Sequence, residues 1–469
     1  MSVIEGLKEI VGAGHVLTGA DTEKYGSDWM GRYIAEPIAV VRPGSTEQVS
    51  RVMALAHDQG IKIVPIGGNT GLTGATYAEG AVMLSLERLN KIREIRADAR
   101  LGIVEAGVIL SNLHDAAEAH GLVFPLTFGA RGSAMIGGAL STNAGGSNVV
   151  RYGSTRGLCL GLEVVLADGR VMDLMSQVHK DNTGYDLKDL FIGGEGTLGV
   201  ITAAVVKLFP KPQAYATAMI ATPGVPEALR LLNRLQAETG GAVEAFEFMA
   251  GSYIENHLRI IEGAKPPFEK SYDVNIMLEV AATSPRDAAP AEDGSIPVVE
   301  RLEQTLADLM EEGAILDAVL AKTEEQRRAI WKRREDAAEV GRGEGRKIGT
   351  DICVPTDKVA VFLERMEAAL PRLDPGATDS WVCHLGDGNL HYAVFPATDS
   401  PETDNAIVEH IEGEVLELGG SFSAEHGVGL MKKASMARRK DPVALDVMRK
   451  LKAALDPNGV LNPGKVLPD

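Results

Sequence analysis

The spacing of apolar residues predicts alternating strands and helices in the first part of the chain. An apolar run at 38–41 stops at a Pro-Gly pair, helical spacing follows at 46–59, and a second apolar run occupies 61–64. A glycine-rich loop follows directly. Further on, short β-type runs such as 161–166 and 200–208 are separated by tight turns. They predict a mixed sheet that ends near Pro210.

From about 213 to 420 the pattern changes to longer strands that alternate with amphipathic helices. Strand candidates lie at 216–222, 243–249, 274–280, 315–321, 347–354 and 381–395. The segment 281–297 is rich in Ala, Pro, Asp and Ser and predicts a surface loop, whereas the tail from Met436 predicts helix. The pattern therefore divides the α+β chain into 1–212, 213–420 and 421–469.

Composition is that of a large folded protein. The 469 residues exceed one common domain, and 45% hydrophobic and 24% charged residues exclude a disordered chain. No apolar run approaches the roughly 18 residues that a membrane-spanning helix needs. The N-terminus lacks the basic, apolar and cleavage segments of a secretory signal. We therefore expect a cytoplasmic protein without a transmembrane segment.

Cysteine content and charge exclude two further classes. The three cysteines, Cys159, Cys353 and Cys383, form no CxxC pair, which argues against a disulfide framework and a thiolate zinc site. The formal net charge of −18 argues against nucleic-acid binding, because a phosphate backbone requires a basic surface. The negative net charge does not exclude a small anionic substrate, since a few Arg or Lys residues in the pocket are enough to bind one.

Two glycine-rich segments, 65–74 and 136–146, predict loops whose backbone N–H groups form an anion site suited to a pyrophosphate. Each segment alone is also compatible with a flexible turn, but two in one domain favour a phosphate-containing cofactor. A third segment, Gly194–Gly199, matches GxGxxG, yet a β-type run follows it and 213–222 contains no carboxylate. A Rossmann NAD enzyme is therefore not predicted, and no P-loop sequence occurs.

Histidines and carboxylates are concentrated near the C-terminus. His384 and His391 flank a Gly-Asp-Gly turn that precedes an alternating strand, and a tight turn would bring the two imidazoles together. With Glu425 as a candidate third ligand they suggest an open catalytic metal site. His426 is a candidate general base, because an imidazole titrates near neutral pH. Ordinary hydrogen-bonded histidines are the alternative.

In combination, these segments resemble the FAD-linked oxidases of the vanillyl-alcohol oxidase and p-cresol methylhydroxylase superfamily. Within it they resemble the D-2-hydroxyglutarate, D-lactate and glycolate dehydrogenases. The segments that carry the resemblance are 65–74, 136–146, 151–154, 180–187, 195–199, 384–391, 423–427 and 461–464. The resemblance implies a two-subdomain FAD-binding domain over 1–212, an α+β cap with an antiparallel sheet over 213–420, and a C-terminal segment that returns to the FAD domain.

The resemblance also implies which residues bind FAD. The loop 65–74 contains no histidine, tyrosine or cysteine, so we expect noncovalent FAD. The implied cofactor-binding residues are Pro65, Gly67, Gly68, Asn69, Thr70, Gly71, Leu72, Gly129, Ser133, Ile136, Gly137, Gly138, Thr142, Asn143, Gly145, Gly146, Tyr152, Glu195, Gly196, Gly199, Ile201 and Asn462.

By the same resemblance, His384, His391 and Glu425 bind a divalent metal, with zinc the expected ion, and His426 is the base. The implied reaction oxidises a D-2-hydroxy acid, with hydride transfer to flavin N5. Arg334, on a helix with several basic residues, matches the arginine of the family's Trp-x-x-Arg motif and would hold a substrate carboxylate. Without the resemblance, such a basic run is more typical of a solvated helix face.

The chain departs from the 2-hydroxyglutarate dehydrogenases at three polar positions, which are Ala338, Gly349 and Ala393 here. Arg346 or Lys347 would then bind a distal carboxylate, with Lys347 our choice, or the substrate is shorter, such as D-lactate. A quinone or an electron-transfer flavoprotein is the expected acceptor, and a homodimer is left open. The alternatives are an oxidase that uses oxygen and an FAD-binding subunit of a larger redox complex.

Overall fold

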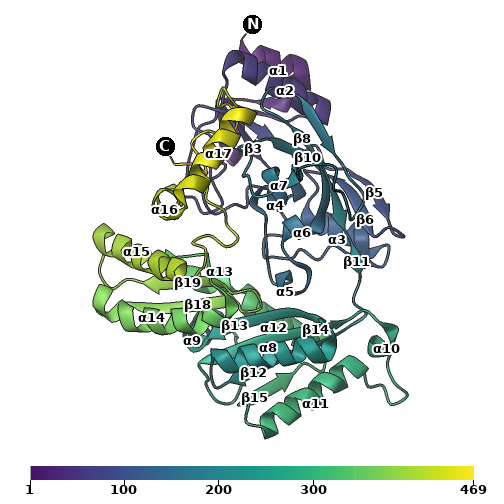
Figure 1. Ribbon diagram of the computed structural model, residues 1–469, viewed down its shortest axis with the longest axis vertical. Coiled ribbons are helices and arrows are strands. Elements are labelled where there is room, and N and C mark those ends of the chain that lie inside the picture. The colour runs from purple at the N-terminus through teal and green to yellow at the C-terminus, as the bar shows by residue number, and fades with distance from the viewer. Residues whose placement is uncertain (1, 344, 469) are drawn as a thin grey trace. The chain divides into compact units, whose positions relative to one another are not determined.

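The computed structural model describes residues 2–343 and 345–468, which form two compact units (Figure 1). Unit 1 comprises Met1–Gly145, Gly153–Pro210 and Glu425–Asp469, and unit 2 comprises Gly146–Tyr152 and Lys211–Ala424. The short segment Gly146–Tyr152 was not expected in unit 2. It belongs there because the Arg151 Nη1 and the Tyr152 hydroxyl both donate hydrogen bonds to Glu244 Oε1.

Unit 1 contains three sheets. A four-stranded sheet has the order β1(Val16–Leu17)-β2(Ala39–Val41)-β4(Val82–Ser85)-β3(Ile63–Ile66), with β2, β4 and β3 parallel. An antiparallel five-stranded sheet has the order β5(Ile92–Arg96)-β6(Leu101–Glu105)-β10(Val200–Lys207)-β8(Cys159–Val165)-β9(Val171–Leu174). The strands β7(Leu122–Val123) and β11(Phe209–Pro210) form a separate pair.

The helices of unit 1 are mostly short. They are α1(Val3–Val11), η1(Ala13–His15), η2(Gly19–Tyr25), α2(Thr46–Gln59), α3(Leu110–Glu118), α4(Ile136–Thr142), α6(Thr155–Leu158), α7(Lys188–Phe191), α16(Lys433–Arg439) and α17(Pro442–Leu455). Local signals bound α2: the Ser45 side chain accepts a hydrogen bond from the Gln48 N–H, and Gly60 ends the helix in the left-handed conformation.

Unit 2 is built on one eight-stranded sheet in which every strand pair is antiparallel. Its strands are β12(Ala214–Thr222), β13(Val243–Ala250), β14(Val274–Ala282), β15(Asp317–Leu320), β16(Ile348–Gly349), β17(Ile352–Cys353), β18(Thr378–His384) and β19(Asn389–Phe395). The three strands β12, β13 and β14 are buried almost throughout, which explains their nearly continuous apolar sequences.

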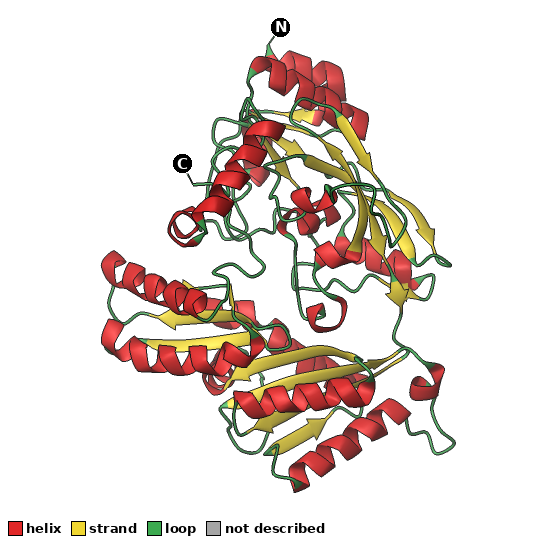
Figure 2. Ribbon diagram, in the orientation of Figure 1, coloured by secondary structure: helices red, strands yellow, loops and turns green. Residues whose placement is uncertain are grey.

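Helices cover both faces of this sheet (Figure 2). One face packs against α8(Val225–Thr239), α11(Pro297–Glu311), α14(Val359–Leu373) and α15(Pro401–Glu417). The other packs against α9(Gly251–Ile260), α12(Glu324–Glu335) and α13(Ala337–Gly343). The remaining helices of unit 2 are α5(Val149–Tyr152), α10(Pro285–Ala288) and η3(Thr356–Lys358).

Several expectations about local structure need correction. The sheet that contains 161–166 and 200–208 was expected to be mixed but is antiparallel throughout. The predicted loop 136–146 contains α4, because Gly137 lets the chain pack closely against Ala106; a Cβ on Gly137 would lie 2.7 Å from the Ala106 Cβ. The predicted strand 347–354 is broken into β16 and β17, and the predicted loop 281–297 contains α10. The strand β10 does follow Gly194–Gly199, so the rejection of a Rossmann fingerprint is confirmed.

Candidate active site

The loop after β3 presents a row of free backbone donors. The amide groups of residues 68 to 72 donate no hydrogen bond to any other described residue. A Cβ on Gly68 would lie 2.0 Å from the Ser133 carbonyl oxygen, so only glycine lets these two segments approach. Successive unpaired N–H groups of this kind form a concave site for an anion.

The segment that contains α4 forms a second wall beside this loop. A Cβ on Gly129 or Gly138 would meet no heavy atom within 4 Å, so open space adjoins their backbone. The helix ends at Asn143, whose φ of 50° is left-handed and whose Oδ1 accepts a hydrogen bond from the Arg156 N–H. A planar or elongated ligand therefore has room along this wall.

The C-terminal segment returns to unit 1, as the resemblance implies. The Asn462 N–H donates to the Ile63 carbonyl, and its Nδ2 donates to the Glu195 carbonyl at 2.8 Å. The buried Glu195 carboxylate accepts hydrogen bonds from the Val428 and Gly429 N–H groups at 2.7 and 2.9 Å. Burial raises the pKa of Glu195, whereas these two hydrogen bonds lower it. The segments around 195, 428 and 462 are thereby held together.

We expect the Gly68→Ala variant to lose, during purification, the FAD that the resemblance assigns to this loop, because its Cβ would overlap the Ser133 carbonyl and displace the loop. We expect the ratio of flavin to protein absorbance to fall at least tenfold. Gly14→Ala is the control, since a Cβ at Gly14 meets nothing within 4 Å and its φ is not left-handed. Full flavin occupancy in Gly68→Ala would contradict the role given to this loop.

Glu425 and His426 begin a glycine-rich loop that is closely packed. A Cβ on Gly145 would lie 2.4 Å from Glu425 Oε1, so the absent side chain makes room for this carboxylate. The Thr73 hydroxyl donates to the His426 carbonyl at 3.3 Å, which fixes the backbone and leaves the imidazole out of this contact. The preceding Ala424 N–H donates to the Asp351 carbonyl at 3.2 Å.

The predicted histidine pair forms in unit 2. His384 ends β18 and His391 lies on β19, and the strand register makes them diagonal neighbours on one face of the sheet. Their Nε2 atoms are 3.4 Å apart. The Nδ1 of His384 lies 2.8 Å from Glu247 Oε1, and the Nδ1 of His391 lies 3.8 Å from Asp351 Oδ1. Each imidazole thus has a buried carboxylate behind it.

Arg334 lies beside the same pair on α12. Its Nε donates to Glu247 Oε2 at 2.7 Å, and its Nη2 is 3.2 Å from His384 Nε2. The Nη1 group makes no hydrogen bond with any described residue. Burial raises the pKa of Glu247, but His384 and Arg334 outweigh burial and hold this pKa at about 2. Glu247 is therefore ionised, and Arg334 keeps donors for another anion.

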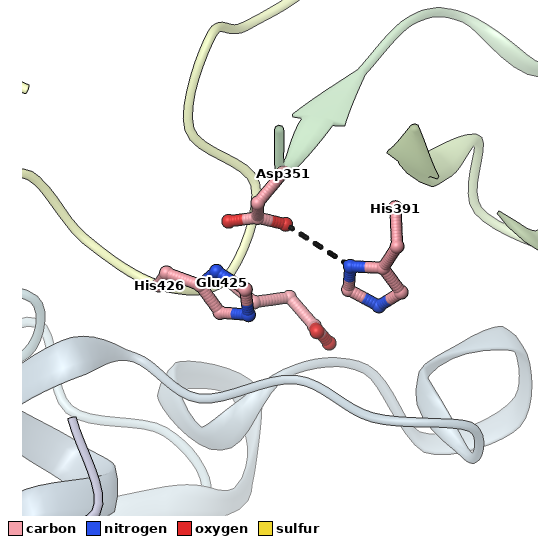
Figure 3. A group of neighbouring side chains, drawn as sticks. All are labelled: Asp351, His391, Glu425 and His426. Carbon is pink, nitrogen blue, oxygen red and sulfur yellow. Dashed lines mark ion pairs between the residues drawn. The ribbon is translucent and has the colours of Figure 1, made fainter. Parts of the chain in front are cut away.

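Four side chains form a group that could hold a metal ion (Figure 3). One ligand atom from each of Asp351, His391, Glu425 and His426 lies within 4.8 Å of the others. His391, Glu425 and His426 were all candidates from the sequence. His384 is outside this group, although its Nε2 adjoins that of His391. Imidazole and carboxylate donors suit zinc and other divalent first-row metals.

Asp387, in the turn between the two histidines, gives a pH-dependent prediction for the metal-free protein. Burial raises its pKa from 3.8 to about 6, although His384 and the Asn389 N–H lower it. The folded state therefore keeps a proton that the unfolded state loses between these values, so stability falls as pH rises through this range. The Asp387→Asn variant should have a free energy of unfolding about 2 to 3 kcal/mol higher than the parent at pH 7.5, which raises Tm by about 5 °C. At pH 4 the two proteins should be almost equally stable. An equal gain at both pH values would contradict this explanation.

The three departures from the dehydrogenase pattern lie in unit 2. Gly349 and Ala393 are cross-strand neighbours on β16 and β19, and a Cβ on Gly349 would meet no heavy atom within 4 Å. Ala338 is exposed on α13. Of the two candidate cations for a distal carboxylate, Arg346 binds Asp404 and Asp399 at the surface. The Lys347 Nζ lies 2.1 Å from the position that a Cβ on Gly341 would take.

Two known protein families match most of the chain. The model described as FAD linked oxidases, C-terminal domain, matches residues 211–466, and the FAD binding domain model matches residues 37–175. The chain belongs to the FAD-linked oxidase family. It is 36% identical to the mitochondrial D-2-hydroxyglutarate dehydrogenase of Bos taurus over 98% of this chain and 82% of that protein. It is 35% identical to the D-2-hydroxyglutarate dehydrogenase of Stutzerimonas stutzeri over 99% and 98% of the two chains.

Solved structures share the fold of this FAD-linked oxidase. p-Cresol methylhydroxylase is 17% identical, with a TM-score of 0.73 over 99% of this chain and 96% of that one. Alkyldihydroxyacetonephosphate synthase is 16% identical, with a TM-score of 0.71 over 98% and 84%. The predicted p-cresol methylhydroxylase type of fold, an FAD-binding domain with an α+β cap and antiparallel sheet, is confirmed.

The expected cytoplasmic location is contradicted by the relatives of this FAD-linked oxidase. Those from Bos taurus, Arabidopsis thaliana and Rattus norvegicus are named as mitochondrial. Composition and the lack of a secretory pattern are compatible with more than one compartment, so they were insufficient for that inference. Across the described residues, every helix is too short or too polar to cross a bilayer.

Two carboxylates of this FAD-linked oxidase were missed in the sequence. Asp351 is 2% exposed and Glu247 is fully buried, and each lies beside one of the paired histidines. A signal was present, because both interrupt segments that were predicted as apolar strands. A charge in a buried strand requires a compensating partner, which makes such positions candidates for a site.

Proposed function

We propose that this chain is an FAD- and divalent-metal-dependent dehydrogenase that oxidises a D-2-hydroxy acid to the 2-oxo acid. The observation that carries the proposal is the pair of imidazoles whose Nε2 atoms are 3.4 Å apart, each with its Nδ1 toward a buried carboxylate. The names of the 35–36% identical relatives support the same substrate class. A flavoprotein that only binds FAD would not require this arrangement.

The FAD-binding residues of this chain are those that the resemblance assigns, and features of unit 1 support them. The unpaired amides of residues 68 to 72 suit a pyrophosphate, and the open space along Gly129 and Gly138 leaves room for the rest of the cofactor. FAD bound there would supply the oxidant, a flavin N5 that can accept the hydride from the substrate Cα.

His384, His391 and Glu425 would hold the metal, which we propose to be zinc. The two Nε2 atoms are 3.4 Å apart, so both could bind one zinc ion. The carboxylates of Glu247 and Asp351 behind the imidazoles are typical of metal-binding histidines. A divalent cation there would act as a Lewis acid and lower the pKa of a bound hydroxyl group.

Arg334 and His426 have distinct tasks in this proposal. The free Nη1 of Arg334 donates to the substrate carboxylate and orients the α-carbon. His426 accepts the proton of the α-hydroxyl group while the Cα–H bond breaks and its electron pair leaves as hydride. The C–O bond becomes a carbonyl, so one hydride and one proton leave the substrate for each 2-oxo acid formed.

The far end of the substrate decides which D-2-hydroxy acid is used. The cross-strand neighbours Gly349 and Ala393 offer no polar side chain to a distal carboxylate, which favours a short acid such as D-lactate. Lys347 favours an acid with a second carboxylate, such as D-malate or D-2-hydroxyglutarate. The relative values of kcat/KM for these acids distinguish the two, and Lys347→Met should lower only the values for the dicarboxylates.

FAD should be bound noncovalently, because none of the side chains from 65 to 74 is a histidine, tyrosine or cysteine. Acid denaturation followed by centrifugation should leave all of the yellow flavin in the supernatant. Flavin absorbance that remained with the precipitated polypeptide would contradict this prediction.

The proposed electron acceptor is a quinone or an electron-transfer flavoprotein, and the alternative is oxygen. The two are separated by comparing the rates of artificial-dye reduction and hydrogen peroxide formation with the same substrate. We expect dye reduction to be much faster. Peroxide formation at the same rate as dye reduction would identify an oxidase instead.

The reaction itself is tested by anaerobic mixing of the flavoprotein with D- and L-enantiomers. At least one D-2-hydroxy acid should bleach the flavin absorbance near 450 nm, and its L-enantiomer should not. A panel of D-2-hydroxy acids without any bleaching would contradict the proposed function.

A further inference from the structure

Glu247 contacts two residues of the proposed site with its two carboxylate oxygens. It lies on β13 directly opposite His384 of β18 and is completely buried. Its Oε1 is 2.8 Å from His384 Nδ1, and its Oε2 accepts a hydrogen bond from Arg334 Nε at 2.7 Å. Glu247 therefore connects His384, a proposed metal ligand, with Arg334, which is proposed to bind the substrate carboxylate.

We infer that Glu247 is a positioning residue that sets both the tautomer of His384 and the direction of Arg334. This inference rests on the proposed function. The carboxylate accepts the His384 Nδ1–H, so the lone pair of the imidazole is on Nε2, which faces Arg334 Nη2 at 3.2 Å and is the atom to which the metal would bind. It also occupies the Nε side of the guanidinium, which leaves Nη1 for the substrate.

Only a carboxylate serves both partners. His384 Nδ1 and Arg334 Nε are both donors in this arrangement, and each requires an acceptor oxygen. A glutamine has one acceptor oxygen and one donor amide, so it would satisfy one partner and oppose the other. Because the carboxylate is shared, a change that moves it should affect metal binding and substrate binding together.

A second ion pair on the same helix provides a matched control. Arg327, two turns before Arg334 on α12, binds the buried Glu279 of β14 through Nε and Nη2, both at 2.7 Å. Trp331 and Thr217 also donate to Glu279. No described histidine contacts Glu279, so its loss removes a buried arginine–carboxylate pair without touching a proposed metal ligand.

The test compares Glu247→Gln and Glu279→Gln as FAD-loaded proteins. Zinc affinity is measured by competition with a chromophoric chelator at pH 7.5, and KM is measured with the D-2-hydroxy acid that reduces the parent fastest. Glu247→Gln should bind zinc about 10- to 100-fold more weakly, and its KM should rise at least tenfold. Glu279→Gln should stay within twofold of the parent in both. Parent-like zinc affinity in folded Glu247→Gln would overturn the inference.

Glu247→Asp keeps the test decisive if the glutamine variant does not fold. It retains the negative charge that neutralises buried Arg334, but its carboxylate is one methylene shorter and withdraws from His384. Zinc affinity should fall at least threefold in the folded protein, and an unchanged affinity would overturn the inference. A parent that binds no zinc would contradict the proposed metal site as well, whereas a zinc-binding parent with unaffected Glu247 variants would contradict only the role of Glu247.

Discussion

The His426→Ala variant should retain FAD and zinc and should reduce its flavin roughly 10²- to 10⁴-fold more slowly than the parent, the range typical of a lost general base. The contact between the Thr73 hydroxyl and the His426 carbonyl uses the backbone and not the imidazole, so the replacement leaves this contact in place. Stopped-flow absorbance under anaerobic conditions measures the rate of flavin reduction directly.

His410→Ala is the matched control for this experiment. His410 is a partly buried histidine on α15 that lies 3.7 Å from Glu414, and it takes no part in the proposed site. Its replacement should leave the rate of flavin reduction within about twofold. If His426→Ala kept its FAD and zinc and was reduced as fast as the parent, His426 would not be the base.

Replacing either histidine of the pair should remove the metal and stop the reaction. His384→Ala and His391→Ala each delete one of the two convergent Nε2 atoms, so bound zinc should fall below about a tenth of the parent value. Loss of the Lewis acid should slow flavin reduction by roughly 10³-fold or more, since it supplies several kcal/mol to such reactions. Metal analysis and stopped-flow reduction check both effects.

The Asp351→Asn variant tests whether Asp351 binds the metal itself or only supports His391. In the proposed site Asp351 lies behind His391, so its replacement should weaken zinc binding about 10- to 100-fold without abolishing it. If Asp351→Asn lost zinc completely while His384→Ala kept it, the ligand set would instead be Asp351, His391, Glu425 and His426.

Elements with local signals were predicted well from the sequence. The helix at 46–59 agrees in both bounds with α2, because Ser45 and Gly60 terminate it within the segment itself. The helix α4 was missed, because its sequence is that of a flexible loop. Its conformation depends on the close approach of Gly137 to Ala106, which is distant in the sequence.

In the candidate site too, contacts that depend on local sequence were predicted and contacts that depend on distant segments were missed. A tight turn joins His384 and His391, so their approach followed from the sequence between them. Glu247 lies 137 residues before His384, and Asp351 comes next to His391 only when β17 pairs with β19. Such long-range pairing requires the sheet order, which the sequence alone did not provide.

We propose that the oxidation of D-2-hydroxy acids by this flavoprotein depends on a bound metal ion. The most direct measurement is an anaerobic titration of the flavin with D-lactate, D-malate, D-2-hydroxyglutarate and glycolate, before chelation, after chelation and after addition of zinc. We predict that at least one D-acid bleaches the flavin, that chelation abolishes the bleaching, and that zinc restores it. Bleaching that persisted in protein shown by metal analysis to be metal-free would contradict the account.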